Sequence, residues 1–425
     1  MVTRIRLVLA LSLVLPLTVP GTALSDSICD PDGLQDSGSI YRICMPPEGE
    51  YNGNLVIWAH GFQDAGTPVQ IPEEQLCVGG VCLPDLINGL GFGFATNSYS
   101  KTGLAIRQGM DDIVDLVDIF AAEKGVPAKV YLVGASEGGI ITALLVEGRP
   151  DVFDAGVCAC GPVGDFPFQI NYFGNGRALF QYFFPGLIPG DPFDPAPLLV
   201  ENWSAYYEQV VKPAVLDPAN RDRLDQLVVV AKLPFDPANY LETAEQSVRD
   251  VLRYSVVNLK DAAETLGGFP FDNRNRLYRG SDNDLLLNLL VPRVDADPEA
   301  ITEMETFYNT SGNLQQQLVT MHTRLDQQVP YLHEPLYILK TIASGSYLTR
   351  HVNVPIDRYG HCNFTPGELV FSFALMLVYD GSLVELSGVG SFLQGDDLDG
   401  FQQRARAASL PYRLEGPRLA ATLKE

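Results

Sequence analysis

A serine stands among small residues in the stretch GASEGG, which begins at Gly134. The apolar run KVYLVG precedes it and an apolar-periodic stretch follows, which predicts a strand, a sharp turn and a helix. Such a turn can raise a serine hydroxyl above the sheet edge only where the neighbouring side chains are small. The small neighbours are Gly134, Ala135, Gly138 and Gly139. We therefore interpret Ser136 as a nucleophile, with a plain helix N-cap as the competing interpretation.

A serine nucleophile needs a base, and the chain has five histidines. His60 ends an apolar run and suits the shaping of a turn that supplies an oxyanion amide. His322 and His351 lie inside predicted strands, where a core role is expected, and His333 follows a Pro-Tyr turn in a helix-like stretch. His361, in YGHCNF, lies on a loop between the last predicted strand and a helix-like stretch. We therefore predict that His361 is the base.

The base in turn needs a carboxylate that holds its tautomer and balances its charge. Asp326 lies just beyond the end of a predicted strand, in HTRLDQQVP. Asp357 is closer to His361 in sequence, but it belongs to the same connecting loop and is expected to cap that loop. Asp326 is favoured, and the resulting order of Ser136, Asp326 and His361 is the nucleophile, acid, base order of α/β-hydrolases.

The motifs WAHGF, GASEGG, HTRLDQQVP and YGHCNF, in this order and with a long insertion, resemble the α/β-hydrolase superfamily. More narrowly, they resemble its secreted serine esterases with a cap domain. The resemblance implies Ser136 as nucleophile, His361 as general base and acid, and Asp326 as the orienting acid. It also implies that the backbone amides of Phe62 and Glu137 form the oxyanion hole, and the mechanism needs no metal or organic cofactor.

Glu137 departs from the resemblance, since relatives often carry an apolar or neutral residue directly after the nucleophile. A fixed negative charge beside a developing oxyanion would oppose it. An acid in the first turn of a helix is stabilised by the helix dipole by about 0.3–1 kcal/mol. We therefore expect the Glu137 side chain to serve its own helix and only its amide to serve catalysis.

Buried, β-rich runs recur along the chain and read as strands of a mostly parallel sheet. They are residues 54–60, 91–98, 129–134, 154–160, 317–323 and 347–354. A helical period is clearest over residues 109–124. Strands that alternate with helices predict an α/β fold, a mostly parallel central sheet flanked by helices.

Between residues 162 and 313 this alternation stops, and the chain becomes rich in Pro, Gly and aromatic residues. This segment is predicted to be a largely helical cap, whose aromatic residues suit either its own core or the wall of an apolar pocket. We accordingly predict four segments. They are a signal peptide (1–25), the first part of the hydrolase core (26–161), the cap (162–313), and the second part of the core with a C-terminal tail (314–425).

The seven cysteines are expected to form disulfides rather than metal sites. Cys77 can pair with Cys82 across a glycine-containing loop, and Cys29 is expected to pair with Cys44. In tannase and feruloyl-esterase relatives, a cysteine before the nucleophile bonds to one after the histidine. Ala135 excludes that bridge here, so Cys158 or Cys160 is expected to pair with Cys362, and one cysteine remains over.

The first 25 residues combine two arginines with an apolar run and small residues before residue 26, which is typical of a cleaved signal peptide. We therefore expect a secreted or periplasmic protein with no stable membrane span after cleavage. The formal net charge is −23, which disfavours binding to nucleic acid. The sequence leaves the oligomeric state open.

The leading hypothesis is a secreted hydrolase that cleaves carboxylic esters, on small aryl or polymeric substrates, through an acyl-enzyme on Ser136. A serine peptidase, amidase or thioesterase would use the same residues, and the sequence does not choose among them. A hydrolase-like binding protein without catalysis is disfavoured, since no member of the predicted triad is missing. Dehalogenase chemistry is disfavoured because the turn holds serine instead of aspartate.

Overall fold

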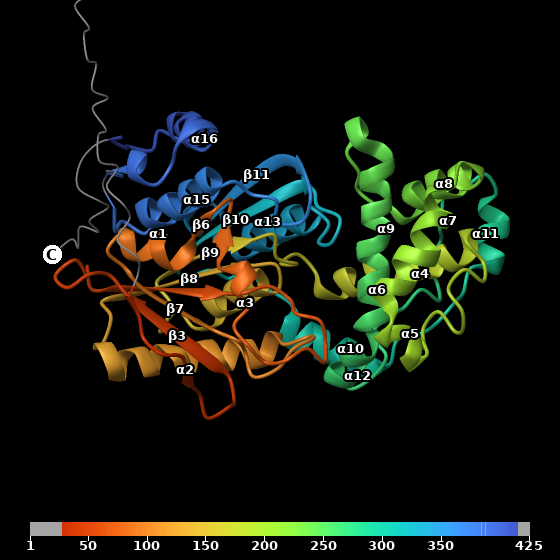
Figure 1. Cartoon of the computed structure of the whole chain (residues 1–425), viewed down its shortest axis with the longest axis horizontal. Coiled ribbons are helices and arrows are strands. Elements are labelled where there is room, and N and C mark those ends of the chain that lie inside the picture. Colours follow the sequence, from red (N-terminus) through yellow and green to blue (C-terminus); the bar gives the residue numbers. More distant parts are fainter. Residues whose placement is uncertain (1–27, 384, 387, 415–425) are drawn as a thin grey trace, which may run out of the picture.

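The computed structural model describes residues 28–383, 385–386 and 388–414. The predicted signal peptide, residues 1–25, lies outside the described residues. Figure 1 shows a sheet flanked by helices, with a separate group of helices beyond one end of the sheet. Within the described residues, none of the helices combines the length and the apolar character that crossing a bilayer requires.

The main sheet of the described residues has nine strands, in the order β1-β3-β7-β4-β8-β9-β10-β11, with β2 paired to β3. All pairings from β7 to β11 are parallel, and those of β1, β2 and β7 with β3 are antiparallel. The strands are β1 (Ile28–Cys29), β2 (Gly33–Leu34), β3 (Ile40–Met45), β4 (Asn54–Ala59), β7 (Gly93–Asn97), β8 (Lys129–Ala135), β9 (Ala155–Ala159), β10 (Gln317–Leu325) and β11 (His351–Tyr359). A separate hairpin pairs β5 (Cys77–Val78) with β6 (Val81–Cys82).

Successive side chains of a strand point to opposite faces of the sheet, and in the central strands both sets are apolar. Helices therefore cover both faces. In β4, Val56 and Trp58 pack in one core cluster with α1 and α15, whereas Leu55 and Ile57 pack in another with α2 and α3. The helices of this body are α1 (Leu83–Gly89), α2 (Ile106–Lys124), α3 (Glu137–Gly148), α13 (His333–Ser344), α14 (Tyr347–Arg350), α15 (Pro366–Tyr379) and α16 (Gly395–Ala407), with the short η1 (Glu73–Gln75) and η6 (Val389–Ser391).

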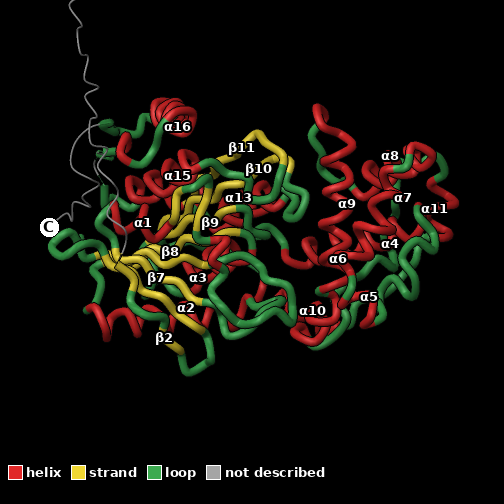
Figure 2. Tube along the Cα trace, viewed as in Figure 1, coloured by secondary structure: helices red, strands yellow, loops and turns green. Residues whose placement is uncertain are grey.

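The chain leaves the sheet after Ala159 and re-enters it at Gln317. All regular elements between these two residues are helices (Figure 2). These helices have for the most part a hydrophobic cluster of their own, which includes Phe180, Trp203 and Val251, although Leu266, Ala300 and Tyr308 pack in a cluster of the body. They are α4 (Phe166–Phe183), α5 (Pro197–Glu201), α6 (Trp203–Tyr206), η2 (Tyr207–Val211), α7 (Lys212–Leu216), η3 (Pro218–Asn220), α8 (Arg221–Ala231), η4 (Pro237–Asn239), α9 (Tyr240–Val257), α10 (Leu259–Leu266), α11 (Asp284–Leu290), α12 (Pro298–Glu303) and η5 (Met304–Tyr308).

The predicted α/β class is confirmed, with differences at individual elements. The strand predicted over residues 347–354 was placed too early, because residues 347–350 form α14 and the strand runs from His351 to Tyr359. The strand β3, which lies between β7 and the short strands β1 and β2, was not predicted. It has half-exposed positions and pairs antiparallel, so it lacks the continuous apolar run of a buried parallel strand.

Candidate active site

Ser136 occupies the turn between β8 and α3, with φ 57° and ψ −117°. Such a backbone conformation costs a residue with a Cβ about 1–3 kcal/mol, and it recurs at functional sites. The Ser136 amide donates to the carbonyl of Ala159 at 2.8 Å, which ties the turn to β9. The Ser136 hydroxyl makes no capping hydrogen bond to α3, so the N-cap interpretation is wrong.

Three glycines allow this turn because a Cβ at any of them would meet backbone atoms. It would lie 2.0 Å from the Ala59 oxygen at Gly138, 2.2 Å from the Gly138 oxygen at Gly134, and 2.7 Å from the Ala159 oxygen at Gly139. The steric demand predicted from GASEGG is therefore real, and it arises from the close approach of β4 and β9 to the start of α3.

The structure brings the predicted serine, histidine and aspartate together. His361 Nε2 lies 2.8 Å from Ser136 Oγ, and His361 Nδ1 lies 2.7 Å from Asp326 Oδ2. Asp326 follows β10 and His361 follows β11, and both strands run parallel to β8. Because the carboxyl ends of parallel strands share one edge of the sheet, three residues distant in sequence meet there.

Asp326 is held in place by more than the histidine. Its Oδ1 accepts hydrogen bonds from the amides of Gln328 and Val329, both at 2.9 Å. The alternative acid, Asp357, lies within β11 rather than on the predicted loop, because the strand extends further than expected. Its side chain is 87% exposed and pairs with Arg324, so Asp357 does not contact His361.

Behind Asp326 the structure places a second imidazole and carboxylate. His322 Nε2 lies 3.3 Å from Asp326 Oδ2 and donates to the Val329 carbonyl at 2.9 Å. On its other side, His322 Nδ1 lies 3.2 Å from Glu334 Oε1. The expected buried position of His322 is confirmed, but its contact with Asp326 was missed. Glu334 comes from α13, and nothing in its local sequence indicated this contact.

Neighbouring charges shift the pKa values of two residues in this buried group, Asp326 and His322. Burial alone would raise the pKa of Asp326, but His361 and His322 more than offset it and hold that pKa well below its usual range. Burial opposes the charged form of His322, yet Asp326 and Glu334 raise its pKa to about 10. His322 is therefore a cation at neutral pH, next to an ionised Asp326.

The remaining histidines make no hydrogen bond to Ser136, Asp326 or His361 among the described residues. His60 is buried, stacks on Tyr99 and donates from Nδ1 to the Gly61 carbonyl at 2.7 Å. Burial lowers its pKa to about 4. His351 is buried beside Thr320 and Thr341, as expected of a core residue. His333 is also buried, and its Nδ1 accepts from the amide of Gly164 at 3.1 Å.

The two residues predicted to supply the oxyanion amides, Phe62 and Glu137, line the same cavity as Ser136. Glu137 is the first residue of α3, and the first amides of a helix lack an intrahelical partner. Phe62 follows Gly61, whose amide donates to Gln75 Oε1 at 2.6 Å. A Cβ at Gly61 would lie 3.3 Å from Ser136 Cβ, so this loop passes directly over the serine.

The Glu137 side chain was predicted to serve its own helix, but in the structure it contacts another helix. It is buried, and its Oε1 accepts a hydrogen bond from the amide of Ala105 at 2.9 Å, which ties α3 to the start of α2. Burial raises the pKa of Glu137 to about 8, although the Ala105 amide works in the opposite direction. A large fraction of this carboxyl is therefore neutral near pH 7, which reduces its opposition to an oxyanion.

A disulfide between Cys160 and Cys362 joins the end of β9 to the loop that carries His361. Of the two predicted partners it is thus Cys160 that pairs, and Cys158 is a buried free thiol. The predicted Cys29–Cys44 and Cys77–Cys82 disulfides are also present. Among the described residues, one group, Cys160, His361 and Cys362, has metal-ligand spacing. The two sulfur atoms of this group are joined in a disulfide, so they are not the thiolates that bind metals.

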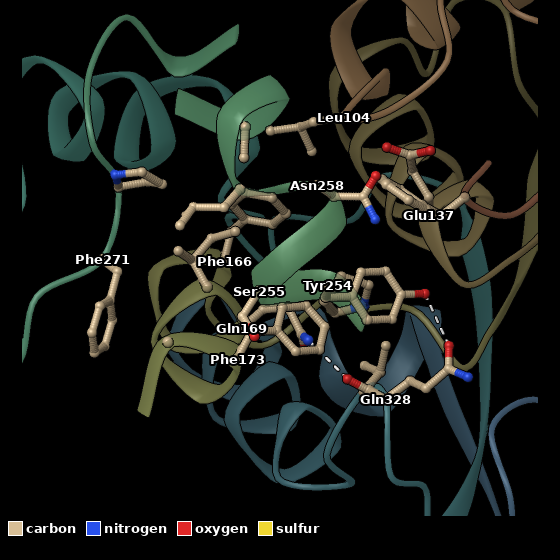
Figure 3. Close-up of a pocket in the computed structure, with 18 of the residues that line it drawn as sticks. Leu104, Glu137, Phe166, Gln169, Phe173, Tyr254, Ser255, Asn258, Phe271 and Gln328 are labelled. Atoms are coloured by element: carbon tan, nitrogen blue, oxygen red, sulfur yellow. Dashed lines mark hydrogen bonds between the residues drawn. The ribbon is translucent and has the colours of Figure 1, made fainter. Parts of the chain in front are cut away.

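Two cavities meet at Ser136. The first lies between the body and the helical segment of residues 162–313 (Figure 3). Aromatic rings dominate its walls, and its polar side chains include Glu137 and Gln169. The residues that line it include Phe62, Ser136, Glu137, Phe166, Ile170, Phe173, Gly174, Arg177, Tyr254 and Phe271.

The second cavity, here called the core cavity, extends from Ser136 and His361 between the sheet and the helices α1 and α15. Its polar lining residues include Gln75, Arg253 and Gln328. Its interior is apolar and is formed by Val56, Trp58, Leu83, Leu86, Ile87, Leu90, Phe94, Val133, Val157, Leu369, Val370 and Phe373. Space of this kind inside a core lowers stability unless an apolar group fills it.

The sheet topology, together with a serine on a strand-turn-helix bend, is that of the α/β-hydrolase fold. The sequence pattern of the prolyl oligopeptidase family matches residues 88–166, which include Ser136. No curated protein sequence matches the chain.

Solved structures with similar backbones include an esterase, a lipase and peptidases. The Pyrococcus furiosus esterase Pf2001 is 8% identical, with a TM-score of 0.42, over 83% of this chain and 91% of that one. Candida antarctica lipase A in its closed state is 13% identical, with a TM-score of 0.40, over 82% and 76%. The Pyrococcus horikoshii acylaminoacyl peptidase is 11% identical, with a TM-score of 0.38, over 79% of this chain. This chain covers only 37% of that peptidase.

Proposed function

We propose that this protein is a serine hydrolase that cleaves carboxylic esters through an acyl-enzyme on Ser136. The observation that carries the proposal is the continuous contact from Ser136 Oγ to His361 Nε2 and from His361 Nδ1 to Asp326 Oδ2. His361 accepts the serine proton during attack and returns it to the leaving alcohol. Asp326 holds the imidazole in the required tautomer and balances its charge.

In this mechanism the oxyanion of the tetrahedral intermediate accepts hydrogen bonds from the amides of Phe62 and Glu137. Donors already in position at that oxygen lower the barrier because no solvent has to reorganise during the reaction. A water molecule, activated by His361, then hydrolyses the acyl-enzyme. The helical segment of residues 162–313 acts as a cap, and the protein works outside the cytoplasm, where disulfides persist.

The core cavity favours an ester over a peptide. An alkyl chain suits its largely apolar interior, where Trp58 Nε1 is a side-chain polar atom without a partner among the described residues, whereas the several polar groups of a buried peptide would find few hydrogen-bond partners there. We infer that the acyl chain enters this cavity, with the leaving group on the cap side.

A peptidase is the second candidate, favoured by the match of residues 88–166 to the prolyl oligopeptidase family, although that match covers a segment common to both chemistries.

The test compares 4-nitrophenyl esters of increasing acyl length with peptide and amide substrates, and labels the protein with a fluorophosphonate. We expect ester hydrolysis and labelling at Ser136. Ser136→Ala and His361→Ala should each lower kcat at least about 10³-fold with unchanged circular dichroism. The exposed Ser204→Ala should leave kcat unchanged. A folded protein without labelling or turnover would contradict the proposal, and faster cleavage of peptides than of esters would favour the peptidase.

A further inference from the structure

Arg177 of α4 is a buried cation without a charged partner. Its side chain is only 1% exposed, and its one hydrogen bond to a described residue runs from Nη1 to the neutral Gln181 at 3.1 Å. Its Nε has no partner. Asp191 acts on Arg177 only through its charge, without an ion pair among the described residues. By contrast, Arg249 and Arg253 of α9 pair with Asp250 and Asp64 respectively.

Burial of an unpaired guanidinium is costly, so arginines of this kind are almost always paired. Burial lowers the pKa of Arg177 to about 10, which still leaves the group charged at neutral pH. Gln181 occupies Nη1 and leaves Nε free. A guanidinium edge that includes Nε matches the two oxygens of a carboxylate.

Arg177 lines the same cavity as Ser136. The residues of α4 that line it recur every three or four positions and end at this arginine, which places them on one face of the helix. They are Phe166, Gln169, Ile170, Phe173, Gly174 and Arg177. From Phe166 to Arg177 this face extends about 16 Å along the helix axis.

Arg177 lies at the end of this cavity away from the serine. A Cβ at Gly174 would lie 2.2 Å from the ring of Phe271, so Phe271 packs directly against α4 one turn before Arg177. Figure 3 shows Phe271 on the opposite side of the cavity from Glu137, the residue that follows Ser136. The rings of Phe166, Phe173 and Tyr254 lie in the space between them.

We propose that Arg177 binds a carboxylate at the far end of the substrate, so that the preferred substrates are esters with an apolar linker between the ester bond and an anionic group. This inference rests on the proposed ester hydrolysis and specifies its substrate class. The net charge of −23 gives the surface no general attraction for anions, so recognition has to come from Arg177 itself. Because Glu137 is largely neutral near pH 7, it adds little repulsion.

The test uses two pairs of eight-carbon esters that differ only in a terminal carboxylate. The acyl pair is 4-nitrophenyl octanoate and the 4-nitrophenyl monoester of octanedioate. The alcohol pair is octyl butyrate and 8-(butyryloxy)octanoate. For the alcohol pair, whose leaving group lies on the side of Arg177, we expect kcat/KM of the anionic member, relative to the neutral one, to fall at least about tenfold in Arg177→Gln. The neutral ester should change by less than about twofold. The exposed Arg223→Gln on α8 is the matched control and should keep the preference.

Equal turnover of charged and neutral esters by the wild type, or a preference that survives Arg177→Gln, would overturn this inference and leave the ester hydrolase intact. If no ester is cleaved, the proposed function fails. In that case, or if Arg177→Gln does not fold, the melting temperature of the wild type tests the carboxylate site. Octanedioate should raise the wild-type Tm more than 1,8-octanediol, and no difference would overturn the carboxylate site. Arg177→Met should keep its Tm closely, since only the hydrogen bond to the neutral Gln181 is lost, whereas a large fall with the preference retained would assign Arg177 to structure alone.

Discussion

His322 Nε2 lies 3.3 Å from Asp326 Oδ2, the same carboxylate oxygen that His361 Nδ1 contacts at 2.7 Å. One carboxylate thus faces two imidazoles, and only one of them contacts the candidate nucleophile. Because the pKa of His322 is raised to about 10, Asp326 lies beside a permanent cation in the physiological range. We infer that His322 is a positioning residue, which acts on His361 through Asp326.

His322→Gln should therefore change the pH dependence of the reaction as well as its rate. Loss of the cation leaves more of the Asp326 charge acting on His361, so the acidic limb of kcat/KM should move to higher pH, by roughly 1 unit. His351→Gln is the matched control, since that buried histidine does not contact Asp326. An unchanged pH profile in His322→Gln would assign His322 to stability alone.

His322 should also make stability depend on pH. A histidine whose folded pKa lies above its unfolded value stabilises the fold fully below about pH 6.5, and this contribution is lost as pH rises through about 10. His322→Gln should cost about 3 kcal/mol of unfolding free energy at neutral pH, because it breaks a buried charge cluster. The difference from the wild type should shrink at alkaline pH, as measured by urea unfolding.

Asp326→Asn should lower kcat by about 10³-fold to 10⁴-fold, with a smaller change in KM, since an amide stabilises the wrong imidazole tautomer. Asp357→Asn is a close control because Asp357 lies near His361 in sequence but is exposed and paired with Arg324. It should retain activity within about twofold. If Asp357→Asn were the damaging change, the assignment of the acid to Asp326 would be wrong.

Glu137→Gln should stabilise the protein at alkaline pH. Because the folded pKa of Glu137 is raised to about 8, its protonated form supports the fold at low pH, and this support is lost as pH rises from about 4.5 through 8. Glutamine does not titrate, so the variant should gain up to a few kcal/mol over the wild type above pH 8 and little near pH 4.

The same substitution bears on catalysis. Ionised Glu137 lies beside the developing oxyanion and opposes it, so wild-type kcat should fall above pH 8 relative to Glu137→Gln. Glu299→Gln, at an exposed position in the first turn of α12, is the control and should follow the wild type. Parallel pH profiles for the wild type and Glu137→Gln would show that this carboxyl is not felt at the reaction centre.

Replacement of Cys160 and Cys362 by serine should lower both stability and kcat. Their disulfide closes a loop of 202 residues, so its loss should cost about 2–5 kcal/mol. It also removes the covalent restraint on the residue next to His361. The Cys29/Cys44 double serine variant, which opens a loop of 15 residues, should lose stability without loss of kcat. Equal effects of the two double variants on kcat would argue against a positioning role for the Cys160–Cys362 bridge.

The candidate triad was predictable because each member follows a recognisable strand. The carboxyl ends of parallel strands meet at one edge, so the order of Ser136, Asp326 and His361 along the chain implied their proximity. Glu137 was only half predictable. Its helix-terminal position follows from its neighbours in sequence, whereas its buried contact with Ala105 depends on how α2 approaches α3. Arg177 gave no signal, since one arginine in an aromatic helix does not indicate whether it is paired.

The cysteines show where sequence reasoning ends. Cys158 and Cys160 are two residues apart, so a regular strand would place both on the same face of the sheet. Cys160 instead adopts a φ of 47°, which ends β9 and turns its sulfur toward Cys362, while Cys158 remains in the core cluster on the α3 side.

The sequence by itself determined the fold class and which residues could carry the chemistry, because both follow from local patterns of apolar, small and titratable residues. Only the tertiary structure decided which sulfur pairs, which carboxylate the imidazole faces and which charges are buried, because these depend on contacts between segments far apart in the chain.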